Sequence, residues 1–161
     1  MPTLYMMVGA PGSGKSYFAK RLYQRMDNCT WISRDEVRMA IVKDDEKYFS
    51  HEKEVFKEFV ARIALWMRSN YDVIADATHL NFPSRRKLVN ALADQEGLTK
   101  DDYEIIFVVM DTALATCVAR DAKRTGRQHV TEKVINDFWN NFRIPTPHEF
   151  PHSKEVWLIR A

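Results

Sequence analysis

Residues 9–16 read GAPGSGKS, and this octapeptide constrains the fold more than any other segment of the chain. It matches the pattern GxxxxGK(S/T), whose glycines let the backbone turn sharply and direct successive N–H groups at an anion. The apolar run 3–8 precedes it, and residues 17–26 follow it without proline or glycine. Strand, loop and helix in this order predict a phosphate-binding loop, because the amino end of the helix also attracts anions.

Each part of the octapeptide suits the binding of a polyphosphate. Lys15 supplies a positive charge, and Ser16 supplies a hydroxyl of the kind that ligates Mg²⁺. We therefore expect a nucleotide together with Mg²⁺. The residues expected to contact the nucleotide in this segment are Gly9, Ala10, Pro11, Gly12, Ser13, Gly14, Lys15, Ser16 and Tyr17.

The composition fits a single globular domain. The chain has 161 residues, of which 45% are hydrophobic, and a formal net charge of +2 that gives no global attraction to nucleic acid or membrane. No apolar run is long enough to span a bilayer, so no membrane association is expected. Cys29 and Cys117 lack a metal-binding or pairing pattern and fit reduced thiols in a cytoplasmic protein.

Short apolar runs alternate with helical patterns along the rest of the chain. The runs expected to be strands are 3–8, 30–32, 72–75, 104–110 and 156–159. The segments expected to be helices are 17–26, 50–69, 83–92, 112–123 and 131–142. This alternation predicts an α/β fold with a five-stranded, mostly parallel sheet and helices on both faces. Ligands should gather at the carboxyl ends of the strands, where Gly9, Asp35, Asp76 and Asp111 fall.

The segment SRDEVR, residues 33–38, follows the second expected strand. If a helix starts near Asp35, then Asp35 and Arg38 lie three positions apart on one face. A carboxylate can orient a hydroxyl and accept its proton, and a guanidinium can hold an anion. An acidic helix cap with a solvated arginine is the alternative interpretation.

Asp76 ends the third expected strand, in the segment VIADATHLN. An aspartate in this place can help to hold Mg²⁺ in phosphate-loop enzymes, or it can be a simple turn residue. We expect Asp76 together with Ser16 to form the metal site.

Residues 120–127 carry four cations, Arg120, Lys123, Arg124 and Arg127, against one acid. The glycine at 126 interrupts the helical pattern. Cations at the carboxyl end of a helix can simply answer its dipole. A small helical lid at about residues 120–131, closing over the nucleotide, would explain why they cluster at a break.

The segment 148–152, HEFPH, matches the zinc protease signature HExxH. Zinc binding would need both histidines on one face of a helix. Pro151 removes a hydrogen bond of that helix and clashes with its preceding turn, so we do not expect a zinc site here.

Taken in order, GAPGSGKS, SRDEVR, VIADATHLN and RDAKR resemble the 5′-kinase domain of bacteriophage polynucleotide kinases and the wider set of P-loop kinases. The likeness spans nearly the whole chain. It implies one P-loop kinase domain over residues 1–161 that uses ATP and Mg²⁺. Phage enzymes also have a phosphatase half with a DxDxT motif, which is absent from this sequence, so kinase activity alone is implied.

The resemblance also implies roles for single residues. Lys15 and Arg124 would act on the transferring phosphate, Arg124 from the lid, and Asp35 would activate the acceptor hydroxyl. Arg38 would hold an acceptor phosphate. Arg120 resembles an arginine that packs on the adenine ring in related kinases. Asp76 and Thr78 stand near the family's acceptor-binding residues, but the pattern there departs from the family at residues 77–79.

Three functions follow from these patterns. The first is ATP-dependent phosphorylation of a 5′-hydroxyl end of DNA or RNA, which makes a nucleic acid end the expected partner. The second is phosphorylation of a small hydroxylated molecule such as a nucleoside or sugar acid, which the nearly neutral net charge favours. The third is ATP binding without catalysis. The chain has no NKxD motif for guanine, so a GTPase switch is not expected.

Overall fold

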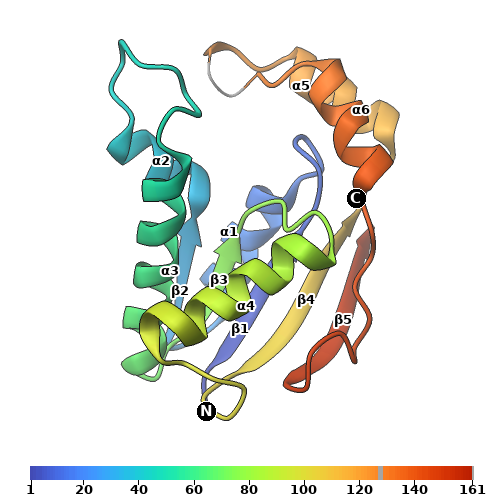
Figure 1. Ribbon diagram of the computed structural model, residues 1–161. Helices are drawn as coiled ribbons and strands as arrows, with labels where there is room; N and C mark the ends of the chain where they lie inside the picture. The colour runs from blue at the N-terminus through green and yellow to red at the C-terminus, as the bar shows by residue number, and fades with distance from the viewer. Residues whose placement is uncertain (127–128, 161) are drawn as a thin grey trace.

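The computed structural model describes residues 1–126 and 129–160, and in this part of the chain strands and helices alternate (Figure 1). The elements are β1 (Thr3–Val8), α1 (Lys15–Arg25), β2 (Cys29–Ser33), α2 (Arg34–Ile41), α3 (Glu52–Arg68), β3 (Asp72–Asp76), α4 (Phe82–Glu96), β4 (Glu104–Asp111), α5 (Leu114–Ala122), α6 (Glu132–Asn141) and β5 (Ser153–Arg160). Each strand and helix expected from the sequence is present, with its ends shifted by a few residues at most. Arg127 of the expected lid lies outside the described residues.

The five strands form one sheet in the order β2-β3-β1-β4-β5, and every pairing in it is parallel. The prediction of a mostly parallel sheet is therefore confirmed. All carboxyl ends lie along one edge, and only β3 separates β1 from β2 there. Because neighbouring strands are about 4.8 Å apart, the ends of β1 and β2 are about 10 Å apart.

Helices cover both faces of the sheet, as predicted. Residues of α2, α3 and α4 pack on one face, in a core that includes Leu4, Met6, Val37, Phe59, Ile63, Leu88 and Phe107. Residues of α1 pack on the other face, in a smaller core around Met7, Ala19, Ile74 and Val108. In Figure 1, α3 and α4 lie in front of the sheet, α1 lies behind it, and α5 and α6 stand beyond its carboxyl edge.

None of the helices in the described residues is long and apolar enough to cross a lipid bilayer.

A buried ion pair lies beneath α4. The side chain of Arg85 is 1% exposed, and it donates from Nε and Nη2 to the two carboxylate oxygens of Glu149 at 2.8 and 2.9 Å. Its Nη1 donates to the carbonyl oxygen of His79 at 2.8 Å. Arg85 thus joins α4, the segment after β3 and the segment before β5. Residues 147–152 form turns and bends, so the segment that matches HExxH is not helical. Its glutamate, Glu149, pairs with Arg85.

We predict that Glu149→Ala lowers the free energy of unfolding by about 3–5 kcal/mol, because it leaves the Arg85 charge buried without a partner. Urea denaturation followed by circular dichroism measures the change. Arg86→Ala, next to Arg85 but exposed, is the matched control and should change stability by less than about 1 kcal/mol. Equal effects of the two substitutions would contradict the structural role of the pair.

Candidate active site

The phosphate loop, residues 9–16, joins β1 to α1 and depends on two glycines with positive φ. Gly14 lies directly before α1 with φ 91°, and Gly12 has φ 80°. A Cβ on Gly12 would lie 2.5 Å from the carbonyl oxygen of Cys117 in α5, too close for any side chain. Cys117 is buried against the loop as a free thiol, as the sequence suggested.

Backbone atoms of this loop form hydrogen bonds with three neighbouring residues along the edge. Gly9 N donates to Thr78 O at 3.1 Å, which joins the ends of β1 and β3. Thr112 Oγ1 donates to Ser13 O at 2.7 Å, and Arg120 Nη1 donates to Gly12 O at 3.2 Å. The loop backbone is therefore fixed both by the segment after β3 and by Thr112 and Arg120 on the β4–α5 side.

Ser16 and Asp76, the two expected metal ligands, lie side by side. Ser16 Oγ donates to Asp76 Oδ2 at 2.8 Å, and the indole Nε1 of Trp31 donates to the same oxygen at 3.1 Å. The Asp76 side chain is buried, and the hydrogen bond from Trp31 fixes its orientation. A hydroxyl and a carboxylate are oxygen ligands that suit Mg²⁺, which usually completes its coordination with phosphate and water. Within the described residues no three His, Cys, Asp or Glu side chains gather into a metal cage.

A cavity of about 730 Å³ lies beside the phosphate loop. It brings together Tyr17 of α1 with Arg120 and Arg124, the two arginines predicted to face the nucleotide. Its floor includes Gly14 and Met110, at the ends of the loop and of β4. The volume is within the range of small-molecule sites in proteins.

The expected lid, about 120–131, begins in α5 and returns to α6. Its return is held by Asp121, which is buried and accepts hydrogen bonds from Val130 N at 2.8 Å and Thr131 N at 3.0 Å. His129 Nδ1 lies 2.9 Å from the same carboxylate. Asp121, the one acid of the basic segment, thus holds residues 129–131 against α5.

Asp35 and Arg38 lie on one face of α2 and form an ion pair at 2.5 Å, as their spacing predicts. The Arg38 side chain is 7% exposed and the Asp35 side chain 65%. Sequence reasoning missed the third member, Glu52 at the start of α3, which accepts from Arg38 Nε at 2.6 Å and Nη2 at 2.9 Å. Arg34 also donates to Glu52, at 3.2 Å.

The charges of this group are strongly coupled. Burial works against the positive charge of Arg38, but the hydrogen bonds and the charge of Glu52 outweigh it, and the pKa of Arg38 is raised. In return, hydrogen bonding to Arg38 lowers the pKa of Glu52. For Arg34, burial is the stronger influence and its pKa is lowered.

Two aromatic side chains from the loop between α2 and α3 cover Arg38. The Arg38 guanidinium lies 5.1 Å from the ring centre of Tyr48 and 4.9 Å from that of Phe49, within the range of cation–π contacts. Tyr48 Oη also donates to Asp35 Oδ1 at 3.3 Å. In Figure 1 this loop and the α5–α6 segment stand on opposite sides of the carboxyl edge. No local motif marks the two rings, so sequence patterns alone do not predict their contact with Arg38.

The segment after β3 lies beside the phosphate loop. The chain turns at His79, which has φ 46° and a side chain directed into the protein. Nδ1 of His79 lies 2.6 Å from the carbonyl oxygen of Met7, the partner to which it donates. Thr78 stays at the edge of the sheet beside the phosphate loop through its bond to Gly9.

The comparison with protein families matches residues 4–145 of the chain to the AAA domain family. The chain belongs to this family. Because the family binds nucleotides through a phosphate loop, nucleotide binding follows for the loop at residues 9–16. No curated protein sequence matches the chain.

Solved structures place the fold among the P-loop kinases. A chain of the Pnkp1/Rnl/Hen1 RNA repair complex is 27% identical, with a TM-score of 0.75, over 94% of this chain and 47% of that one. This chain therefore spans about half the length of that relative. A sugar kinase from Janibacter sp. is 13% identical, with a TM-score of 0.65, over 99% and 85%. Kti12 from Chaetomium thermophilum, in complex with ADP-AlF3, is 16% identical, with a TM-score of 0.66, over 99% and 89%. The last two similarities concern the fold alone.

The resemblance to polynucleotide kinases is confirmed at this level. The chain has an α/β P-loop kinase fold similar to that of a protein from an RNA repair complex.

Burial lowers the pKa of His79 to about 4, against an ordinary value of 6.5. As the pH falls, His79 therefore binds a proton near pH 6.5 in the unfolded chain but only near pH 4 in the folded chain. We predict that folding stability is full above pH 6.5 and falls as the pH drops towards 4, by up to about 3 kcal/mol from this group.

Urea denaturation at pH 7.5 and pH 4.5 measures this loss. The variant His79→Asn is the control, since asparagine tolerates positive φ and does not titrate. The stability difference between wild type and variant should shrink at pH 4.5. A difference that does not depend on pH would contradict the assignment to His79.

Proposed function

We propose that the chain transfers the γ-phosphate of ATP to a 5′-hydroxyl end of DNA or RNA. One observation carries this proposal: the exposed carboxylate of Asp35, held by Arg38, lies at the end of β2, one strand away from the β3 end that pairs with the phosphate loop. Phosphoryl transfer needs an oriented hydroxyl opposite the phosphate donor, and this edge of the sheet offers both positions.

On the donor side, the backbone of residues 9–16 and Lys15 would hold the ATP phosphates, and Arg124 would meet the charge that develops on the transferring group. Ser16 and Asp76 would hold Mg²⁺, which neutralises phosphate charge when it is bound. Arg120 donates to the loop carbonyl of Gly12, so it shapes the loop in addition to lining the nucleotide cavity.

On the acceptor side, Asp35 would accept the proton of the 5′-hydroxyl as that oxygen attacks the γ-phosphorus. The bond from the γ-phosphorus to the bridging oxygen breaks, and ADP leaves. We assign Arg38 chiefly to holding Asp35 in place, because its guanidinium is nearly buried and tied to Glu52. Arg38 would also contact a phosphate of the acceptor. Thr78 and Asp76 would contact the acceptor beside it.

The similarity to a chain of an RNA repair complex, at 27% identity, supports a nucleic acid acceptor over a small molecule. An acceptor screen with one stock of γ-labelled ATP and Mg²⁺ tests the proposal. The screen compares 5′-hydroxyl RNA, 5′-hydroxyl DNA, nucleosides and sugar acids. Good transfer to a nucleoside or sugar with none to either strand would replace the proposal by a small-molecule kinase. Nucleotide binding without transfer to any acceptor would favour a non-catalytic module.

We predict that Asp35→Asn lowers the rate of phosphoryl transfer by about a hundredfold or more, the usual effect of losing a general base. ATP affinity should remain within about twofold of wild type, since Asp35 lies outside the phosphate loop. Single-turnover kinetics and a nucleotide-binding titration measure the two quantities. Glu36→Gln, the neighbouring exposed acid, is the matched control. A wild-type rate for Asp35→Asn would remove Asp35 from the mechanism.

A further inference from the structure

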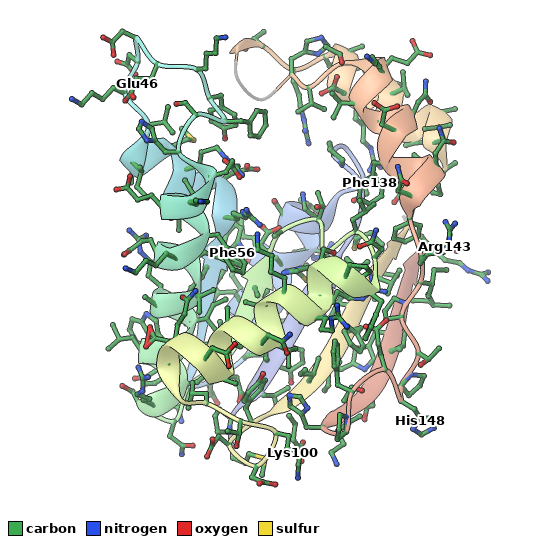
Figure 2. The ribbon with its side chains drawn as sticks, in the orientation of Figure 1. Glu46, Phe56, Lys100, Phe138, Arg143 and His148 are labelled. Atoms are coloured by element: carbon green, nitrogen blue, oxygen red, sulfur yellow. The ribbon has the colours of Figure 1, made fainter. Side chains whose placement is uncertain are left out.

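A second cavity of about 730 Å³ lies away from the phosphate loop, in a groove between α3 and α4. Figure 1 shows these helices drawing together towards their carboxyl ends, where Arg68 of α3 is paired with Glu96 of α4 at 3.0 Å. Towards their amino ends they lie farther apart. Figure 2 shows Phe56 between the two helices, and its half-buried ring forms part of the groove.

The groove is strongly basic for a chain with a net charge of +2. Its lining holds five cations against two acids, and these seven are Arg34, Lys53, Lys57, Arg86, Lys87, Glu52 and Asp94. Arg34 pairs with Glu52. The other four cations are exposed, and none forms an ion pair within the described residues.

Two of the cations meet at one aromatic ring. The Arg34 guanidinium lies 5.3 Å from the ring centre of Phe56, and the Lys87 ammonium lies 4.6 Å from it. Like charges gathered at one site repel each other, and the cation–π contacts offset only part of that cost. An anion in the groove would relieve the repulsion, and the ring offers an apolar face beside it.

The groove adjoins the proposed acceptor site at Glu52, which lines the groove. Glu52 accepts hydrogen bonds from both Arg38, which holds Asp35, and Arg34, which lines the groove. A ligand that places a hydroxyl at Asp35 can therefore extend past Glu52 into the groove. A free nucleoside or sugar would end before reaching it.

We propose that this groove binds the sugar–phosphate backbone of a single strand whose 5′-hydroxyl end lies at Asp35. The inference rests on the proposed function and extends it, because it names the surface that selects a polymer. The four unpaired cations would contact successive phosphates and Phe56 would pack against a base or sugar. From Pro83 to Asn90, α4 rises about 10 Å, a length that fits two or three phosphates.

The test compares two acceptors: a 5′-hydroxyl strand of about 12 nucleotides, as RNA and as DNA, and a nucleoside 3′-phosphate, which is too short for the groove. The groove variants are Lys53→Ala/Lys57→Ala and Arg86→Ala/Lys87→Ala. The control is Lys20→Ala/Lys154→Ala, which removes two exposed lysines outside the groove. Fluorescence anisotropy measures strand affinity against salt, and labelled ATP measures transfer.

We expect both groove variants to weaken strand binding, and to raise the KM for the strand, by about tenfold. The slope of log affinity against log salt should fall by about 1.4 for two lost contacts. For the groove variants, the KM for the nucleoside 3′-phosphate should equal that of wild type. For the control variant, strand affinity, salt slope and both KM values should equal those of wild type.

Strand affinity and salt slope equal to those of the control would overturn the groove, and would leave an acidic protein surface as the partner that fits its charge. Groove-dependent strand binding without transfer to either acceptor would support the groove and overturn the proposed kinase activity. The two inferences can therefore fail separately.

Discussion

The strand order β2-β3-β1 is the constraint on which the rest of the site depends. Because all three strands are parallel, the phosphate loop, Asp76 and Asp35 follow at neighbouring positions along one edge. The register sets Ser33, the residue before α2, opposite Asp76. Hydrogen bonds from Ser16 and Trp31 to the one Asp76 oxygen then join all three strand ends. The parallel sheet thus brings the phosphate loop, Asp76 and Asp35 close together without long connecting loops.

Two nearly buried arginines have different roles in this fold. Arg38 and Arg85 are both nearly buried, and each faces a glutamate with two hydrogen bonds. Burying a charge is costly, so such pairs need good geometry to persist. The hydrogen-bond partners of Arg85 are Glu149 and the backbone of His79, which join elements of the fold and lie away from the proposed acceptor site. Arg38, in contrast, has a second carboxylate partner, Asp35, whose side chain is 65% exposed, so this group of charges reaches the surface, where a substrate can bind.

Local sequence signals predicted the elements and half of the site. The glycine spacing marked the phosphate loop, apolar runs marked the strands, and the three-residue spacing put Asp35 beside Arg38. The partner Glu52 lies 14 residues from Arg38, and Glu149 lies 64 from Arg85. No periodicity links residues across such separations, because only the packed sheet brings their elements together. The turn at His79, with its positive φ and its buried imidazole, likewise depends on packing and carries no local signal.

Net charge alone does not describe the surface that an acceptor meets. From the sequence, a value of +2 favours a small molecule, because acids and bases are nearly equal in number along the chain. Folding separates them: Asp35, Glu52, Glu58, Glu96 and Glu149 pair with arginines. Lys53 and Lys57 of α3 instead line one groove together with Arg86 and Lys87 of α4. A phosphate backbone responds to the charges within about 10 Å of it, the screening length at moderate salt, and not to the total. The arrangement of charge around Phe56 is therefore the quantity that bears on a polymer acceptor.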